Sequence, residues 1–187
     1  GLWLVWKTAG VGEQWFETDA DLPAGKTVAG QPDHPKGDIQ VFFTSPSEQP
    51  AWNGGLDAAL AADIDKARTS VDLACYELDL QSVTDALLRA SQRGVRVRVV
   101  IDADNLSLDQ PQALIRAGVP LVTDDRTALM HNKFVVIDGQ ITWTGSWNLT
   151  DSGTYLNNNN TIRILGHKAA ANYGRELDEM FTSRSFG

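Results

Sequence analysis

Hydrophobic residues recur with two spacings, every second residue in some segments and every third or fourth in others. The first spacing is typical of strands and the second of helices. Strands are predicted at residues 39–44, 71–76, 95–101, near 119, 133–138, 140–144 and 161–165. Helices are predicted at residues 56–68, 81–93, 110–117 and 168–181. Because strands and helices alternate, the pattern predicts a layered α/β fold around a mostly buried sheet.

Residues 1–38 differ from the rest of the chain. They contain scattered aromatic residues among glycines, prolines and aspartates, and no period is sustained. We interpret them as an extended N-terminal arm that packs a few aromatic side chains onto the domain formed by residues 39–187. His34 and Lys36 form a His-x-Lys pair in this arm, but they lie next to prolines and are interpreted as part of a loop.

The composition limits the classes of protein to which the chain can belong. Of 187 residues, 42% are apolar and 21% charged, which is ordinary for a soluble domain. No apolar run approaches the roughly 18 residues that span a bilayer, so no transmembrane segment is predicted. Cys75 is the only cysteine, which excludes an internal disulfide, and its apolar surroundings predict a packed, unreactive thiol. The chain begins at Gly1, which suggests a fragment or a processed exported protein, so a secreted or periplasmic location is one hypothesis.

One segment carries the candidate chemistry. His131 and Lys133 are two residues apart on a predicted strand, so their side chains point to the same side of the sheet. The chain then turns after Asp138 and returns to Ser146 and Asn148 at the end where His131 lies. The hairpin therefore gathers an imidazole, an ammonium, a hydroxyl and an amide. Three of these groups donate hydrogen bonds to phosphate oxygens, and one attacks phosphorus.

This segment resembles the signature of the phospholipase D superfamily, H-x-K-x4-D-x6-G-S-x-N. Every fixed position is met, by His131, Lys133, Asp138, Gly145, Ser146 and Asn148. The resemblance extends over about residues 39–181, because the preceding order of strands and helices is also similar. It implies a mixed, mostly buried β-sheet flanked by helices on both faces. Residues 39–187 are accordingly expected to form a phospholipase D-like catalytic domain.

The resemblance implies a metal-independent phosphodiester hydrolase that needs no cofactor. His131 is then the nucleophile that forms a phosphohistidine, and Lys133 holds the substrate phosphate. Ser146 and Asn148 are expected to bind the same phosphate, with capping of the following segment as the alternative. Asp138 is counted among the catalytic residues, with a structural role in the Asp-Gly turn as the alternative.

One position departs from the family pattern. Single-motif members usually carry a glutamate about 28 residues after the motif histidine, where it accepts the Nδ1 proton and orients the ring. Here that position holds Asn159. An amide oxygen still accepts the hydrogen bond but carries no charge to stabilise an imidazolium. Asn159 is therefore predicted to orient His131 with a loss of catalytic rate, and a simple turn before a strand is the alternative.

A single motif supplies a single histidine. Displacement at a phosphodiester needs a nucleophile on one side of phosphorus and an acid on the other. The resembled family places two motifs face to face, and the second histidine protonates the leaving oxygen. We therefore predict a two-fold homodimer or a second motif-bearing half that completes the site. No spacing of His, Asp or Glu elsewhere predicts a dedicated metal site.

Three hypotheses describe the substrate. Nuclease-like hydrolysis leads, because short single-motif members resemble endonucleases, although a net charge of −8 disfavours tight binding of nucleic acid. Arg89, Arg93, Arg96 and Arg98 would then form a basic strip, with a solvated charged face as the alternative. Hydrolysis of phospholipid headgroups is second, with the tryptophans of the N-terminal arm and Trp147 at a membrane surface. A weakly active or inactive module that binds phosphorylated ligands is third, motivated by the missing glutamate.

Overall fold

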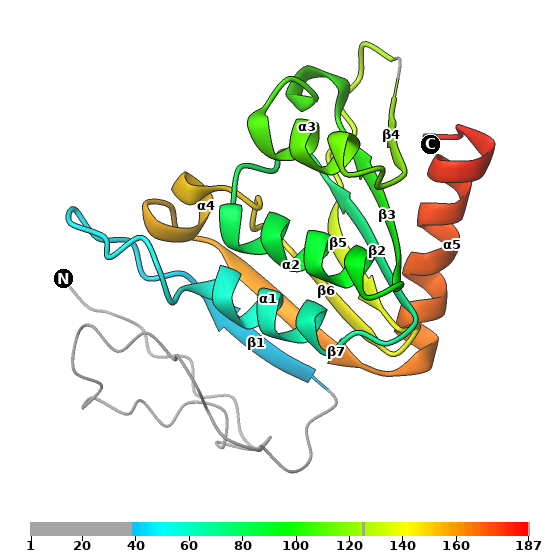
Figure 1. Cartoon of the computed structure of the whole chain (residues 1–187). Coiled ribbons are helices and arrows are strands. Elements are labelled where there is room, and N and C mark those ends of the chain that lie inside the picture. Colours follow the sequence, from blue (N-terminus) through cyan, green and yellow to red (C-terminus); the bar gives the residue numbers. More distant parts are fainter. Residues whose placement is uncertain (1–38, 125, 187) are drawn as a thin grey trace, which may run out of the picture.

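The computed structural model describes residues 39–124 and 126–186 (Figure 1). The predicted arm at residues 1–38, with its His-x-Lys pair, lies outside the described residues. In chain order the elements are β1 (Ile39–Phe43), α1 (Leu56–Asp65), β2 (Ser70–Cys75), α2 (Gln81–Gln92), β3 (Arg96–Ile101), a 3-10 turn (Ala103–Asn105), α3 (Asp109–Arg116), β4 (Leu121–Thr123), β5 (Lys133–Ile137), β6 (Ile141–Gly145), α4 (Asp151–Tyr155), β7 (Asn160–Leu165) and α5 (His167–Ser183).

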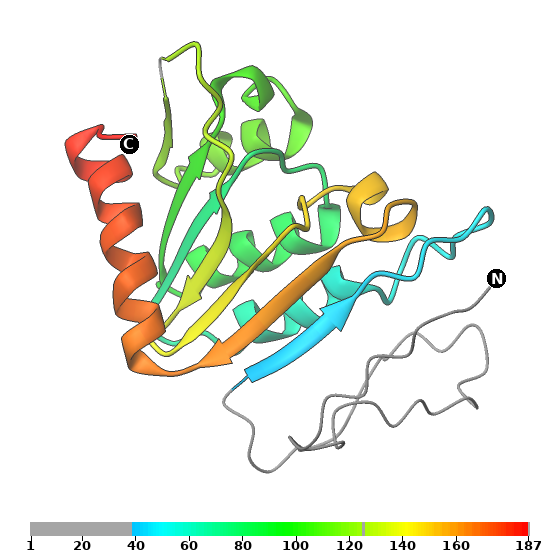
Figure 2. The same ribbon diagram turned by 180° about the vertical axis from the view of Figure 1, so that it is seen from behind.

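The strands form one seven-stranded sheet in the order β1-β7-β6-β5-β2-β3-β4. Strands β2, β3 and β4 are parallel, and the other neighbours are antiparallel. Helices α1 and α2 cover one face of the sheet, and α5 crosses the other (Figures 1 and 2). The mixed sheet with helices on both faces confirms the predicted fold class.

The core lies on both sides of the sheet because consecutive strand residues point to opposite faces. Leu73 and Val135 belong to the cluster beneath α1 and α2. Their chain neighbours Ala74 and Val136 belong to the cluster beneath α5, which includes Leu177. Strands buried on both faces need apolar residues at nearly every position, and this explains the continuous apolar runs in the sequence.

The predicted strands and longer helices are present with boundaries within a few residues, but α4 was not predicted. Its five residues are too few to show a helical period. Thr150 begins this helix, and its side chain accepts a hydrogen bond from the backbone N–H of Gly153 at 2.9 Å. The cap is therefore Thr150 and neither Ser146 nor Asn148. No helix within residues 39–124 and 126–186 is long and apolar enough to cross a membrane.

Candidate active site

The predicted hairpin is formed by β5 and β6. The two strands are antiparallel, and Phe134 lies opposite Thr144. The start of β5 and the end of β6 therefore lie at the same end of the sheet. On its other side β5 pairs with β2, where Lys133 lies opposite Cys75, the last residue of that strand. The end of β2, the start of β5 and the end of β6 consequently lie side by side at one end of the sheet.

His131 and Lys133 lie on the same side at this point. Strand β5 begins at Lys133, so His131 precedes the strand and is not part of it. Both side chains nevertheless contact Tyr76: the ring centroids of His131 and Tyr76 are 5.0 Å apart, and the Lys133 Nζ lies 5.5 Å from the Tyr76 centroid. The Lys133 Nζ also donates a hydrogen bond to the His131 carbonyl oxygen at 3.0 Å. The His131 side chain is exposed, which leaves its imidazole open to a ligand.

The ammonium of Lys133 is available for an anion. Burial lowers the pKa of Lys133 from its ordinary value, because a low-dielectric environment disfavours the charged form. The same environment strengthens attraction between the ammonium and a phosphate. Within residues 39–124 and 126–186, no carboxylate forms an ion pair with Lys133.

Ser146 and Asn148 follow β6 at the same end of the sheet. The Ser146 backbone N–H donates to the Asn160 carbonyl oxygen at 3.0 Å, and its hydroxyl donates to the Asn159 Oδ1 at 3.1 Å. The Asn148 Oδ1 is buried and has no hydrogen-bond partner among the described residues. Trp147 is only 3% exposed and donates from its indole to the Thr154 Oγ1 at 3.0 Å. The expectation that Trp147 contacts a membrane surface is therefore wrong.

Asp138 lies at the opposite end of β5. A strand rises about 3.3 Å per residue, which separates Asp138 from Lys133 by about 17 Å. Its carboxylate accepts hydrogen bonds from the backbone N–H groups of Arg68, Thr69 and Ser70 and from the Thr69 hydroxyl. The structure does not bring Asp138 to the site. It has instead the structural role that was its alternative, since it anchors the connection between α1 and β2.

Asn159 makes no hydrogen bond to His131. Its Nδ2 donates to the Gly153 carbonyl oxygen at 2.8 Å, and its Oδ1 accepts the Ser146 hydroxyl at 3.1 Å. Both ends of the amide thus stabilise the connection between β6 and β7. The predicted hydrogen bond from His131 is absent, and the imidazole makes no hydrogen bond within the described part of the chain.

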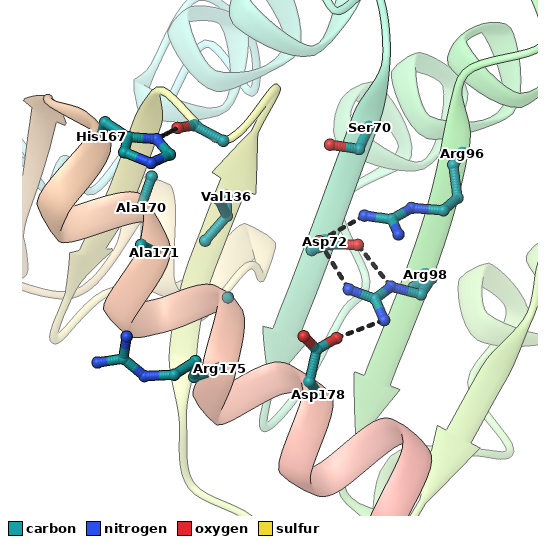
Figure 3. A pocket seen from close by; sticks show the side chains of 12 residues that line it. Ser70, Asp72, Arg96, Arg98, Val136, His167, Ala170, Ala171, Arg175 and Asp178 are labelled. Atoms are coloured by element: carbon teal, nitrogen blue, oxygen red, sulfur yellow. Dashed lines mark hydrogen bonds and ion pairs between the residues drawn. The ribbon is translucent and has the colours of Figure 1, made fainter.

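The predicted basic strip is wrong. Arg89 and Arg93, at the end of α2, both pair with Asp65. Figure 3 shows Arg96 and Arg98 beneath α5, where both pair with Asp72, and Arg98 also pairs with Asp178. The arginines lie on different faces of the sheet, and the charge of each is balanced by an aspartate, which sequence spacing could not reveal.

Two residues near the site lie outside the motif. Tyr76 follows β2, and Asp102 follows the parallel strand β3. The buried carboxylate of Asp102 accepts the backbone N–H of Met130 at 2.7 Å and so holds the residue before His131. The signal for both was positional: each follows a strand at the carboxyl edge of a parallel pair, where ligand sites commonly lie.

The remaining chemistry-bearing groups do not form another site at this end. Burial raises the pKa of Cys75 to about 12, which agrees with the predicted unreactive thiol. His167 is exposed at the start of α5. In the described ranges, no cluster of three or more His, Cys, Asp or Glu residues is placed to hold a metal ion.

The family model described as "Cardiolipin synthase, PLD-like domain" matches residues 60–181. The chain belongs to the phospholipase D superfamily. Among relatives in this superfamily, a phospholipase D of Rickettsia conorii is 31% identical over 137 residues, covering 72% of this chain and 65% of the relative. A mitochondrial cardiolipin hydrolase of Xenopus tropicalis is 32% identical over 118 residues, covering 62% of this chain and 56% of the relative. The chain thus spans less than two thirds of the length of each of these relatives.

A solved structure has the same superfamily fold. Nuc from Salmonella typhimurium, described as a phospholipase D family member, superposes with a TM-score of 0.64 at 26% sequence identity. The match covers 75% of this chain and 91% of Nuc. The fold that carries the motif is therefore nearly the whole of that protein.

Proposed function

We propose that this chain hydrolyses phosphodiesters, with His131 as the nucleophile and Lys133 as the group that holds the phosphate. The observation that carries the proposal is that both side chains contact the same ring, that of Tyr76, at one end of the sheet. The imidazole is exposed and has no hydrogen-bond partner among the described residues, so one ring nitrogen is free to attack. The unpaired ammonium beside it would balance the charge of the non-bridging oxygens.

The proposed reaction has two displacements. A His131 ring nitrogen attacks phosphorus, a phosphohistidine forms, and the bond from phosphorus to the leaving oxygen breaks. A second histidine protonates that oxygen. Water then attacks phosphorus as the second histidine removes its proton, and the nitrogen–phosphorus bond breaks. The amide of Asn148 is proposed to donate hydrogen bonds to the phosphate throughout. Ser146 is proposed to donate one as well, by turning its hydroxyl from the Asn159 Oδ1 to a phosphate oxygen.

The second histidine requires another copy of the motif. The described residues contain one motif, so we propose that a homodimer, or a second motif-bearing half, completes the site. Light scattering on the purified chain, combined with activity on the same fractions, tests this requirement. Activity is expected to elute with the dimer, and full activity in a strict monomer would overturn the two-histidine mechanism.

Turnover separates an enzyme from a phosphate-binding module. We expect hydrolysis of bis(p-nitrophenyl) phosphate by the wild-type chain and none by His131→Ala. His167→Ala is the matched control, because His167 is also exposed but lies at the start of α5. A wild-type chain that binds phosphate without turnover would favour the hypothesis of a binding module. That hypothesis rests on position 159, where an asparagine stands and no carboxylate is present.

For the substrate we propose nuclease-like hydrolysis, supported by the extent of the match to Nuc. Hydrolysis of phospholipid headgroups is the second candidate, because relatives are named phospholipase D and mitochondrial cardiolipin hydrolase. The balanced arginines remove one local reason to favour nucleic acid. Plasmid DNA, RNA and phosphatidylcholine vesicles, tested side by side, distinguish the two: release of the lipid headgroup without nucleic-acid cleavage would reverse the order.

A further inference from the structure

The aromatic ring of Tyr76 contacts both proposed catalytic side chains. The His131 ring lies at 5.0 Å between centroids with an interplanar angle of 61°, an edge-to-face arrangement that aromatic pairs favour. The Lys133 Nζ lies 5.5 Å from the same centroid, within the range of a cation–π contact. One ring thus contacts both groups that must act on the same phosphate.

Tyr76 is held by backbone contacts on both sides. Cys75, the preceding residue, is paired in β2 with Lys133. The Tyr76 carbonyl oxygen accepts a hydrogen bond from the Asn105 Nδ2 at 2.9 Å. Two residues later, Leu78 forms a β-bridge with Leu149. The ring therefore projects from a segment whose backbone is fixed before any ligand binds.

The histidine lacks another orienting partner among the described residues. Both ends of the Asn159 amide are bonded to Gly153 and Ser146. In the structure, the contact with the Tyr76 ring takes the place of the hydrogen bond that a carboxylate would accept. A held ring limits the rotation of the imidazole, and preorganisation of this kind lowers the barrier to attack.

We infer that Tyr76 is the positioning residue for this site, and that its ring, not its hydroxyl, orients His131 and holds Lys133 beside it. The inference rests on the proposed function. The Tyr76 hydroxyl has no hydrogen-bond partner within the described ranges, whereas the ring makes both contacts. A phenylalanine at this position preserves them, and a leucine removes them.

The test compares Tyr76→Phe with Tyr76→Leu in steady-state hydrolysis of bis(p-nitrophenyl) phosphate. We expect Tyr76→Leu to lower kcat about tenfold with little change in KM, because reactive orientation is lost more than substrate affinity. Tyr76→Phe should retain the wild-type kcat within about twofold. Tyr173→Leu is the matched control: Tyr173 packs against Phe134 on the α5 face, at 5.0 Å between centroids, and its loss should leave kcat unchanged.

Equal losses in the Phe and Leu variants would overturn the inference, because the hydroxyl would then be the important group. Wild-type kcat in a folded Tyr76→Leu variant would also overturn it. Proton NMR of the wild-type chain provides a measurement that needs neither activity nor a folded leucine variant. The His131 ring protons and the Lys133 side-chain protons should show ring-current shifts that persist in Tyr76→Phe. Absent shifts reject the positioning role, whereas clear shifts in a chain without turnover reject only the proposed function.

Discussion

The carboxylate of Asp138 accepts hydrogen bonds from three backbone N–H groups and one hydroxyl, all in residues 68–70. Asp138→Asn removes its negative charge with almost no change in shape. Asp138 has a φ of 53° in the left-handed region, which asparagine tolerates well, so the substitution adds no backbone strain. The variant therefore isolates the contribution of the charge.

The expected loss of stability follows from these contacts. Hydrogen bonds to a charged group contribute about 1.5–3 kcal/mol each, against about 0.5–1.5 kcal/mol for neutral pairs. The new amide nitrogen would also face the Arg68 N–H, which donates to Oδ2 at 2.9 Å in the wild type. Partial solvent exposure weakens each contact, so we expect about 2 kcal/mol in total. For a chain of this size that lowers the melting temperature by about 4–8 °C.

The effect should depend on pH. Partial burial raises the pKa of Asp138, but the backbone N–H groups of Ser70, Thr69 and Arg68 outweigh it and hold the pKa below its ordinary value. A lowered pKa contributes stability above the unfolded value of about 3.9, and this stability is lost as the pH falls through the folded value. The difference between wild type and variant should be complete at neutral pH and shrink below about pH 4.

Thermal unfolding followed by circular dichroism, at a series of pH values, measures this difference. Asp104→Asn is the matched control, because Asp104 is exposed. The melting temperature of this variant should equal that of the wild type. Activity of Asp138→Asn per folded molecule should equal that of the wild type. Lost activity with unchanged stability would refute the structural role and would support a catalytic role for Asp138.

Three further results are expected. His131→Ala should abolish turnover and Lys133→Ala nearly so, and neither should lower the melting temperature appreciably; retained turnover in either variant contradicts the mechanism. Activity should survive dialysis against EDTA, since the ammonium supplies the positive charge, and full loss on chelation would count against the site. Gly145→Ala should cost about 1–3 kcal/mol in unfolding, because its Cβ would lie 2.8 Å from the Thr161 Cα and clash with backbone. Gly174→Ala, with open space at its Cβ, is the control and should be neutral or stabilising.

Local patterns along the chain were sufficient for the elements and for the motif. The apolar residues at positions 134–137, 141 and 143 predicted β5 and β6, and the turn after Asp138 predicted that they form a hairpin. The hairpin in turn predicted that His131 and Lys133 lie at the same end as Ser146. These inferences succeeded because residues within a strand or a short hairpin are related by fixed geometry.

Contacts between distant segments were decided only by the tertiary structure. The pairing of β2 with β5 brings Tyr76 beside His131, although some 55 residues of chain separate them. The same packing places aspartates from other elements against the arginines. It also places Ser146 and Gly153 where they form hydrogen bonds with the two ends of the Asn159 amide. Sequence spacing could predict which side chains lie within one hairpin. It could not predict which residues of other elements would contact those side chains. A hydrogen bond or ion pair forms only between groups within about 3 Å of each other, and the order of the strands decides which groups come that close.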